Sequence, residues 1–144
     1  MEKLPTKKQI NPHPGDLDGD YAVKNWLNKS IKEGASLFEE NALHYAEDFS
    51  YMGHYAFNYY LQSAILYAQS KASIEDSDFI NSFIGTLKFR YKYDKKVIKK
   101  SINRCLELLS VIVDEYPKYE VNKEIYGDLE GKAKKLIKKL NNYK

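Results

Sequence analysis

Three aspartates at alternate positions, Asp16, Asp18 and Asp20, have the spacing that most resembles a ligand set in this chain. Carboxylates at positions one, three and five begin the calcium loop of an EF-hand, which also requires a glycine at position six and a glutamate at position twelve. Here position six is a tyrosine and position twelve is a leucine. The spacing therefore predicts no calcium site. We expect instead a turn at Asp18–Gly19, followed by a helix whose N-cap is Asp20.

A second group of potential ligands comprises Glu40, His44 and Asp48, which follow one another at four-residue spacing. On a continuous helix they would share one face. Helical di-iron sites, however, combine glutamates with Glu-x-x-His motifs from separate helices, and the chain contains no such motif. We interpret these residues as an exposed acidic helix face and expect neither a metal nor another cofactor.

The single cysteine, Cys105, lies within an apolar helical seam, where burial would suppress the reactive thiolate. No nucleophile motif or phosphate-binding loop accompanies it, so the sequence predicts no enzymatic activity. A lone cysteine cannot form an intramolecular disulfide, which suits a reducing compartment. Because we also identify no signal peptide and no membrane span, the expected location is the cytoplasm.

Aromatic residues are concentrated between Tyr45 and Tyr67. Tyrosine combines an apolar ring with a polar tip and is enriched at protein interfaces. Two interpretations are open: a core whose tyrosines reach its rim, or an exposed binding surface. Helix starts lie at domain edges, so the candidate partner-binding surface surrounds Gly53 and consists of Asp48, Tyr51, His54 and Tyr55.

Lysines are concentrated in the second half of the chain, which is the more basic half of a protein with a net charge of +3. One cluster stands at the start of a predicted helix, where free backbone amides and cations together can bind an anion. The candidate anion-binding residues are Lys95, Lys96, Lys99, Lys100 and Arg104. The alternative is a solvated helix face, and we expect any nucleic-acid binding to be weak and salt-sensitive.

The elements that must position these residues are helices, because apolar residues recur at three- and four-residue spacing and no strand-like alternation is present. Ser30 and Glu33 form a capping box at one helix start. The segment His54–Ser70 is apolar nearly all round, which predicts a central helix. Further helices are expected at Tyr21–Leu27, Leu43–Phe49, Asp76–Tyr91, 95–116 and Lys123–Leu140.

The predicted fold is therefore all-α, a single compact helical domain of about four long helices plus short ones. Three of the four prolines fall among the first 20 residues. We expect residues 1–20 to form an extended N-terminal arm packed on the domain formed by residues 21–144.

Two stretches carry a resemblance: Asn11-Pro12-His13-Pro14 through Asp18-Gly19, and Met52-Gly53-His54-Tyr55-Ala56-Phe57-Asn58-Tyr59-Tyr60. The chain resembles a group of small bacterial all-helical proteins that share a Pro-His-Pro…Asp-Leu-Asp arm and a Met-Gly-x-x-Ala-Phe-x-Tyr-Tyr helix. The likeness covers residues 4–90 and implies no activity for any particular residue.

The expected function is a non-enzymatic protein-interaction module, in the manner of small immunity or adaptor proteins, with another protein as its partner. The alternative is a weak anion or nucleic-acid binder that uses the basic second half. A metal-dependent enzyme is a distant third. No membrane partner is expected.

Overall fold

The computed structural model describes residues 2–144, which form helices and no strand. The predicted all-α fold is confirmed. The helices are α1 (Lys7–Ile10), α2 (Leu17–Trp26), α3 (Ile31–Glu47), α4 (His54–Gln69), α5 (Ser77–Tyr93), α6 (Lys95–Lys100), α7 (Ile102–Asp114), α8 (Lys123–Tyr126) and α9 (Leu129–Tyr143). Three short 3-10 turns, η1 (Asp48–Ser50), η2 (Lys71–Ser73) and η3 (Tyr116–Tyr119), connect some of them. None of the helices in this part of the chain has both the length and the apolar character needed to cross a bilayer.

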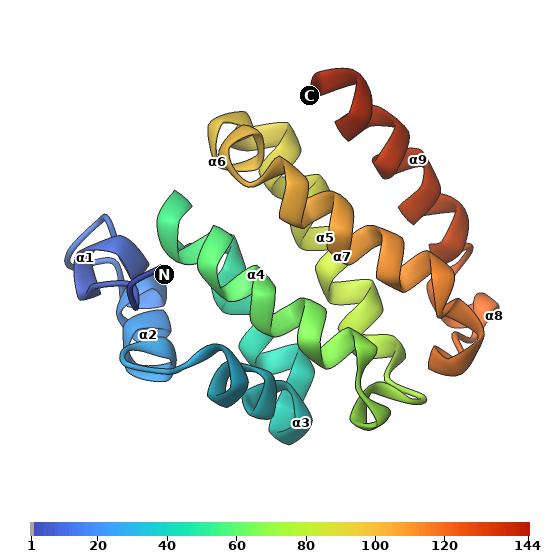
Figure 1. The fold of residues 1–144 in the computed structure, drawn as a ribbon, viewed down its shortest axis with the longest axis horizontal. Helices are drawn as coiled ribbons and strands as arrows, with labels where there is room; N and C mark the ends of the chain where they lie inside the picture. Colours follow the sequence, from blue (N-terminus) through green and yellow to red (C-terminus); the bar gives the residue numbers. More distant parts are fainter. Residues whose placement is uncertain (1) are drawn as a thin grey trace.

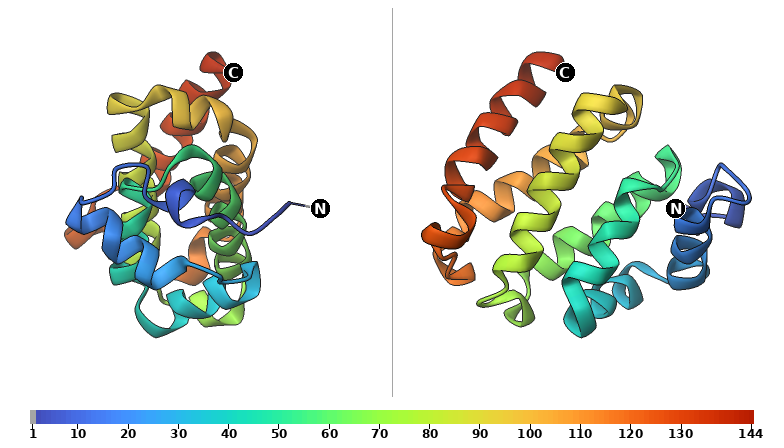
Figure 2. Two further views of the ribbon diagram at one scale, coloured as in Figure 1. Left: turned by 90° about the vertical axis from the view of Figure 1, so that its left-hand side faces the viewer. Right: turned by 180° about the vertical axis from the view of Figure 1, so that it is seen from behind.

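The long helices form two layers. Helices α3, α5 and α9 lie side by side in one layer, and α4 and α7 lie in the other (Figures 1 and 2). The chain passes from one layer to the other with each successive long helix, so α4 packs on α3 and α7 packs on α9. Helices α1 and α2 cover one end of this arrangement (Figure 1). As a result α5 and α9 are neighbours although α7 separates them along the chain.

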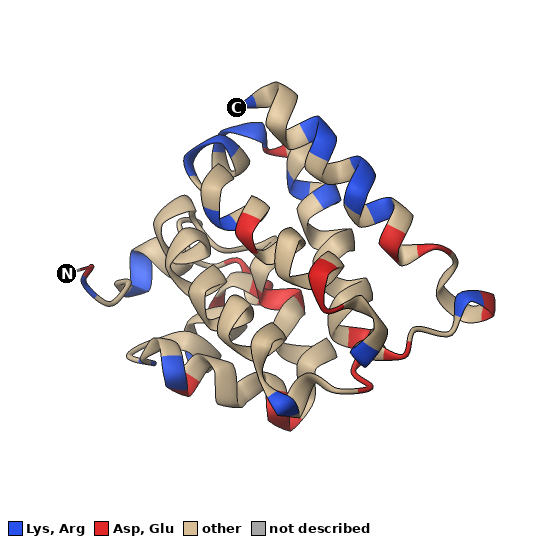
Figure 3. Ribbon diagram, turned by 45° about the vertical axis from the view of Figure 1, so that its right-hand side comes forward, with Lys and Arg blue, Asp and Glu red and all other residues tan. Residues whose placement is uncertain are grey.

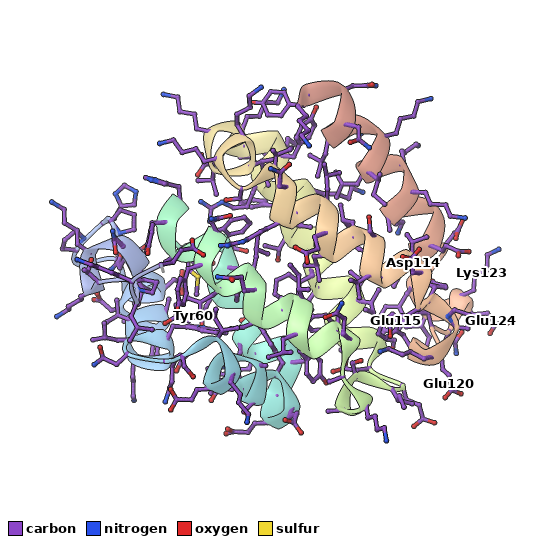
Figure 4. The ribbon with its side chains drawn as sticks, in the orientation of Figure 1. Tyr60, Asp114, Glu115, Glu120, Lys123 and Glu124 are labelled. Atoms are coloured by element: carbon purple, nitrogen blue, oxygen red, sulfur yellow. The ribbon has the colours of Figure 1, made fainter. Side chains whose placement is uncertain are left out.

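Helix α4 is central, as its composition predicted. Phe57, Tyr60, Leu61 and Ala64 are fully buried in it. The hydroxyl of Tyr60, labelled in Figure 4, lies 2.8 Å from the main-chain oxygens of both Trp26 and Lys29, and these two acceptors share its single proton. These bonds satisfy the polar tip of a buried ring, and they fix the loop between α2 and α3 against α4.

A cluster of mutually packed rings fills the space between α2, α3, α4 and α5. Trp26 lies 5.3 Å from Phe49 and 5.6 Å from Phe38 between ring centroids, and Phe38 lies 5.6 Å from Phe83. Most pairs are tilted or edge-to-face, the geometry that aromatic quadrupoles favour. Most of the aromatic residues between Tyr45 and Tyr67 therefore belong to the core.

The start of α2 differs from the prediction. Asp16 occupies the N-cap position and the helix begins at Leu17, so the expected turn at Asp18–Gly19 and the expected N-cap at Asp20 were wrong. The reason is Asn11, whose side-chain amide donates to the Asp20 carboxylate at 3.0 Å. A Cβ on Gly19 would lie 2.3 Å from the Asn11 side-chain oxygen. The glycine permits this close approach rather than a turn.

The first 20 residues are accordingly less extended than expected. Thr6 and Gln9 form a capping box that starts α1, and Ile10 is fully buried. The predicted boundary at residue 20 falls inside α2.

Two predicted long helices are interrupted. Ser101 (φ −115°, ψ 14°) separates α6 from α7, and Gly127 (φ 74°) separates α8 from α9. Asp94 makes no capping bond, because its carboxylate pairs with Arg90 at 2.9 Å. The capping box at Ser30 is confirmed, and α3 contains a kink at Asn41.

Candidate functional site

The most distinctive surface feature is a groove between α5–α6 and α9. One recess of about 290 Å³ is lined by Lys88, Tyr91, Lys92, Lys95, Leu136 and Lys139. A second recess of about 250 Å³ shares Lys88, Leu136 and Lys139 with the first and adds Lys132 and Lys135. We call the six lysines of these joined recesses the lysine groove: Lys88, Lys92, Lys95, Lys132, Lys135 and Lys139.

The lysines converge because of helical spacing and helix packing. Lys88, Lys92 and Lys95 follow one another at four and three residues, and the α9 lysines repeat the pattern at three and four. Each set therefore occupies one side of its segment. Because α5 and α9 pack against each other, the two sides face a common groove. Figure 3 shows lysines grouped on α9 and on the turn around α6, at the end of the molecule where the chain ends.

The positive charge of the groove is not neutralised internally. Ion pairs between residues 2 and 144 join Arg90 to Asp94, Arg104 to Glu2, Lys118 to Glu115 and Lys134 to Glu130, and none involves a groove lysine. All six groove lysines are exposed. The ammonium of Lys95 stands 5.1 Å above the ring of Tyr91. An anion entering the groove would therefore meet ammonium groups that belong to no ion pair, above a floor of Tyr91 and Leu136. One of them, the ammonium of Lys132, also donates to the main-chain oxygen of Tyr126 at 3.5 Å.

Acidic residues, interspersed with Lys118 and Lys123, lie near the start of α9. Asp114, Glu115, Glu120 and Glu124 gather around the end of α7 and around α8 (Figure 4). Hydrogen bonding and charge from the neighbouring Glu75 raise the pKa of the Glu120 carboxyl. Carboxylates also begin α9, where Asp128 is the N-cap and Glu130 lies in the first turn. Charge is thus segregated along α9, acidic at its start and basic over the rest.

The structure disperses the predicted anion-binding residues. Lys95 lines the groove, whereas the ammonium of Lys99 donates to the main-chain oxygen of Tyr143 at 3.0 Å. Arg104 makes an ion pair with Glu2 at 2.6 Å. Lys96 and Lys100 are exposed but do not line the groove. The helix that begins at this cluster, α6, is only six residues long.

Sequence reasoning missed five of the six groove lysines: Lys88, Lys92, Lys132, Lys135 and Lys139. The available signal was the helical spacing within each set. That spacing reveals two helices that each have a basic side. It does not reveal that α5 packs beside α9, because that contact depends on the tertiary fold.

Asp48 is buried, unlike the exposed residue that the predicted partner-binding surface requires. Its side chain is buried and accepts hydrogen bonds from Trp26 Nε1 at 3.0 Å and Asn25 Nδ2 at 2.9 Å. Burial raises the pKa of the Asp48 carboxyl, and the two bonds offset part of that effect. The sequence could not reveal this role, because the partner residues lie on α2, more than 20 residues earlier.

The other members of the predicted partner surface differ in accessibility. Tyr51 and His54 are exposed. Tyr55 is half-buried, and its hydroxyl donates to the main-chain oxygen of Lys3 at 2.5 Å, which fastens the N-terminal segment to α4. Only Tyr51 and His54 therefore present largely free side chains.

The other candidate ligands do not form a cluster around one point. Asp16 and Asp20 serve as the α2 N-cap residue and as the acceptor for Asn11. The non-helical backbone of Asn41 interrupts the face that would have aligned Glu40 with His44. Cys105 is buried, and burial raises the pKa of its thiol to about 12, so the thiolate is suppressed.

Comparison with known protein families, with curated proteins and with solved structures finds no match to this chain. The argument for function consequently rests on the surface chemistry of the molecule, and in particular on the lysine groove.

Proposed function

We propose that this protein is a non-enzymatic interaction module of the cytoplasm, and that its lysine groove binds an acidic segment of a partner protein. The observation that carries the proposal is the convergence of six exposed lysines, none in an ion pair within residues 2–144, on one groove. Such a module would act through its partner, in the manner of small immunity or adaptor proteins.

The length of the basic surface favours a short acidic segment. Lys132 and Lys139 are seven residues apart on α9, which corresponds to about 10 Å along the helix axis. Acidic side chains three or four residues apart on a partner helix lie about 5–6 Å from each other. Two or three carboxylates therefore fit within the groove.

A long nucleic acid fits this surface less well. Duplex DNA carries about one charge per 1.7 Å of its axis and would extend beyond the groove. Towards the start of α9 it would meet Glu130 and Asp128. Arginine, the residue best suited to bidentate phosphate recognition, takes no part in the groove, because Arg90 and Arg104 are paired with Asp94 and Glu2.

Two side chains of a type used in catalysis, those of Cys105 and Asp48, are buried in the structure. Cys105 is buried with a raised thiol pKa, and the buried carboxylate of Asp48 accepts bonds from Trp26 and Asn25. Because neither side chain is available to a substrate, these observations support a binding function over catalysis.

The proposal is tested by fluorescence anisotropy with two labelled probes of equal negative charge, a glutamate-rich helical peptide and a single-stranded oligothymidylate. We expect the peptide to bind more tightly, and its affinity to fall as salt rises from about 50 to 200 mM. Tighter binding of the oligonucleotide would instead support the alternative, a nucleic-acid binder. Binding of neither probe at low salt would refute both.

A matched pair of variants distinguishes binding in the lysine groove from attraction by the net charge of the protein. The groove variant is Lys88→Gln/Lys92→Gln/Lys139→Gln, and the control is Lys7→Gln/Lys8→Gln/Lys24→Gln, which removes the same charge from α1 and α2. An ion pair in water contributes up to about 1 kcal/mol at 4 Å. We therefore expect the groove variant, which removes three such pairs, to lose up to about 100-fold in affinity and the control about twofold. Equal losses would show that only overall charge matters.

A further inference from the structure

Two exposed aromatic side chains lie on α5 immediately beside the lysine groove. Phe89 is 48% exposed and Tyr93 is 67% exposed. Their ring centroids are 5.0 Å apart. Lys92, which lines the groove, also places its ammonium 5.1 Å from the centre of the Tyr93 ring. The aromatic pair and the groove therefore form one continuous surface.

The surface next to Phe89 is recessed rather than covered. A depression of about 350 Å³ is lined by one aromatic residue, Phe89, and otherwise by glycine and polar residues: Gly85, Thr86, Asn81, Ser82, Ser50 and Glu47. A Cβ placed on Gly85 would meet no atom within 4 Å, which shows how open the surface is one turn before Phe89. Exposed aromatic residues beside a cavity are typical of interface anchors.

We infer that Phe89 and Tyr93 are an apolar anchor site, and that the partner segment is an amphipathic acidic helix. Its carboxylates enter the lysine groove while an apolar side chain packs against the aromatic pair. This inference rests on the proposed function, since the same groove supplies the charge contacts. A helix suits the surface because it presents acidic and apolar residues in adjacent strips.

The ring geometry favours an apolar side chain over a nucleobase. Bases stack on open, flat aromatic faces. Here the two rings are inclined at 51° to each other, and Lys92 stands over one face of Tyr93. An aliphatic side chain needs no parallel platform and can pack against the edges of the two rings.

The test uses two helical peptides with identical acidic residues. One carries leucines in the strip beside the carboxylates, and the other carries serines there. The protein variants are Phe89→Ala/Tyr93→Ala and Tyr93→Ala, with Ile74→Ala/Ile125→Ala as a control that truncates exposed apolar residues elsewhere. Affinities are measured by titration calorimetry, and thermal unfolding of each variant reports its folding.

We expect the wild-type protein to bind the leucine peptide about tenfold or more tightly than the serine peptide. Phe89→Ala/Tyr93→Ala should abolish that preference and leave serine-peptide affinity unchanged, with a partial effect in Tyr93→Ala and none in the control. If the folded double variant keeps the leucine preference, the anchor is refuted while the groove proposal stands. If neither peptide binds wild-type protein, the proposed function fails. If the double variant instead loses affinity for oligothymidylate, the rings stack bases and the inference is overturned.

Discussion

The stability of Asp48 variants tests whether this carboxylate holds the core together or only lies at the surface. Asp48→Leu removes the acceptor of Trp26 Nε1, a donor on a fully buried ring. A buried donor left without a partner costs about 1–3 kcal/mol. Asn25 is less buried and can turn to water, so it adds little. We therefore expect Asp48→Leu to lower the free energy of unfolding by ~2 kcal/mol.

Asp48→Asn is the matched control, because its amide oxygen can still accept from Trp26. We expect it to cost less than ~1 kcal/mol at neutral pH, since it also removes a buried charge. Urea unfolding followed by circular dichroism and by the fluorescence of Trp26, the only tryptophan, measures both variants. If Asp48→Leu is as stable as the wild type, the carboxylate is not part of the architecture.

The same pair of proteins gives a pH test. Burial raises the pKa of Asp48 above its ordinary value of 3.8, so the folded state holds the proton more tightly than the unfolded state. Its stabilising contribution is then fully present below pH 3.8 and is lost as pH rises through the raised value. Relative to Asp48→Asn, the wild type should lose stability over that window. A gain would show that the bonds from Trp26 and Asn25 outweigh burial.

Three further outcomes are expected. Leu61→Ala should lower the free energy of unfolding by ~2–5 kcal/mol, because Leu61 is fully buried. Leu66→Ala, at an exposed site on the same helix, should lower it by less than about 0.5 kcal/mol. If the two variants lose the same stability, α4 is not the central helix. Hydrogen bonds from Arg104 lower the pKa of Glu2 below its ordinary value of 4.5. Any stability advantage of the wild type over Glu2→Gln should therefore be present above pH 4.5 and vanish on acidification. An advantage that grows on acidification would contradict this. Cys105, whose thiol pKa is about 12, should react with thiol reagents only after unfolding, and rapid native labelling refutes its burial.

The features that sequence could predict are those set by nearby residues. The capping box of Ser30 and Glu33 spans four positions, and both of its bonds are present. The central role of α4 followed from a composition that leaves only a narrow polar stripe. The seven-residue apolar repeat after residue 95 was also visible, although the break at Ser101 was not.

The features that sequence missed depend on contacts between distant segments. The sequence predicted a turn at Gly19, whereas in the structure this glycine leaves room for the side chain of Asn11. Asp48 carries a charge that ordinarily stays in water, and its burial depends on Trp26 from another helix. The lysine groove joins residues more than 40 positions apart, so two ordinary basic helix sides become one site only in the folded protein.

The most direct test of the central claim is a heteronuclear NMR titration of the full chain with the leucine-bearing acidic peptide. The account predicts saturable amide shifts concentrated around residues 85–96 and 131–140, which are the segments that flank the lysine groove and the aromatic pair. Saturable shifts centred instead on Tyr51 and His54, or on α1 and α2, would place the binding surface elsewhere and contradict the account.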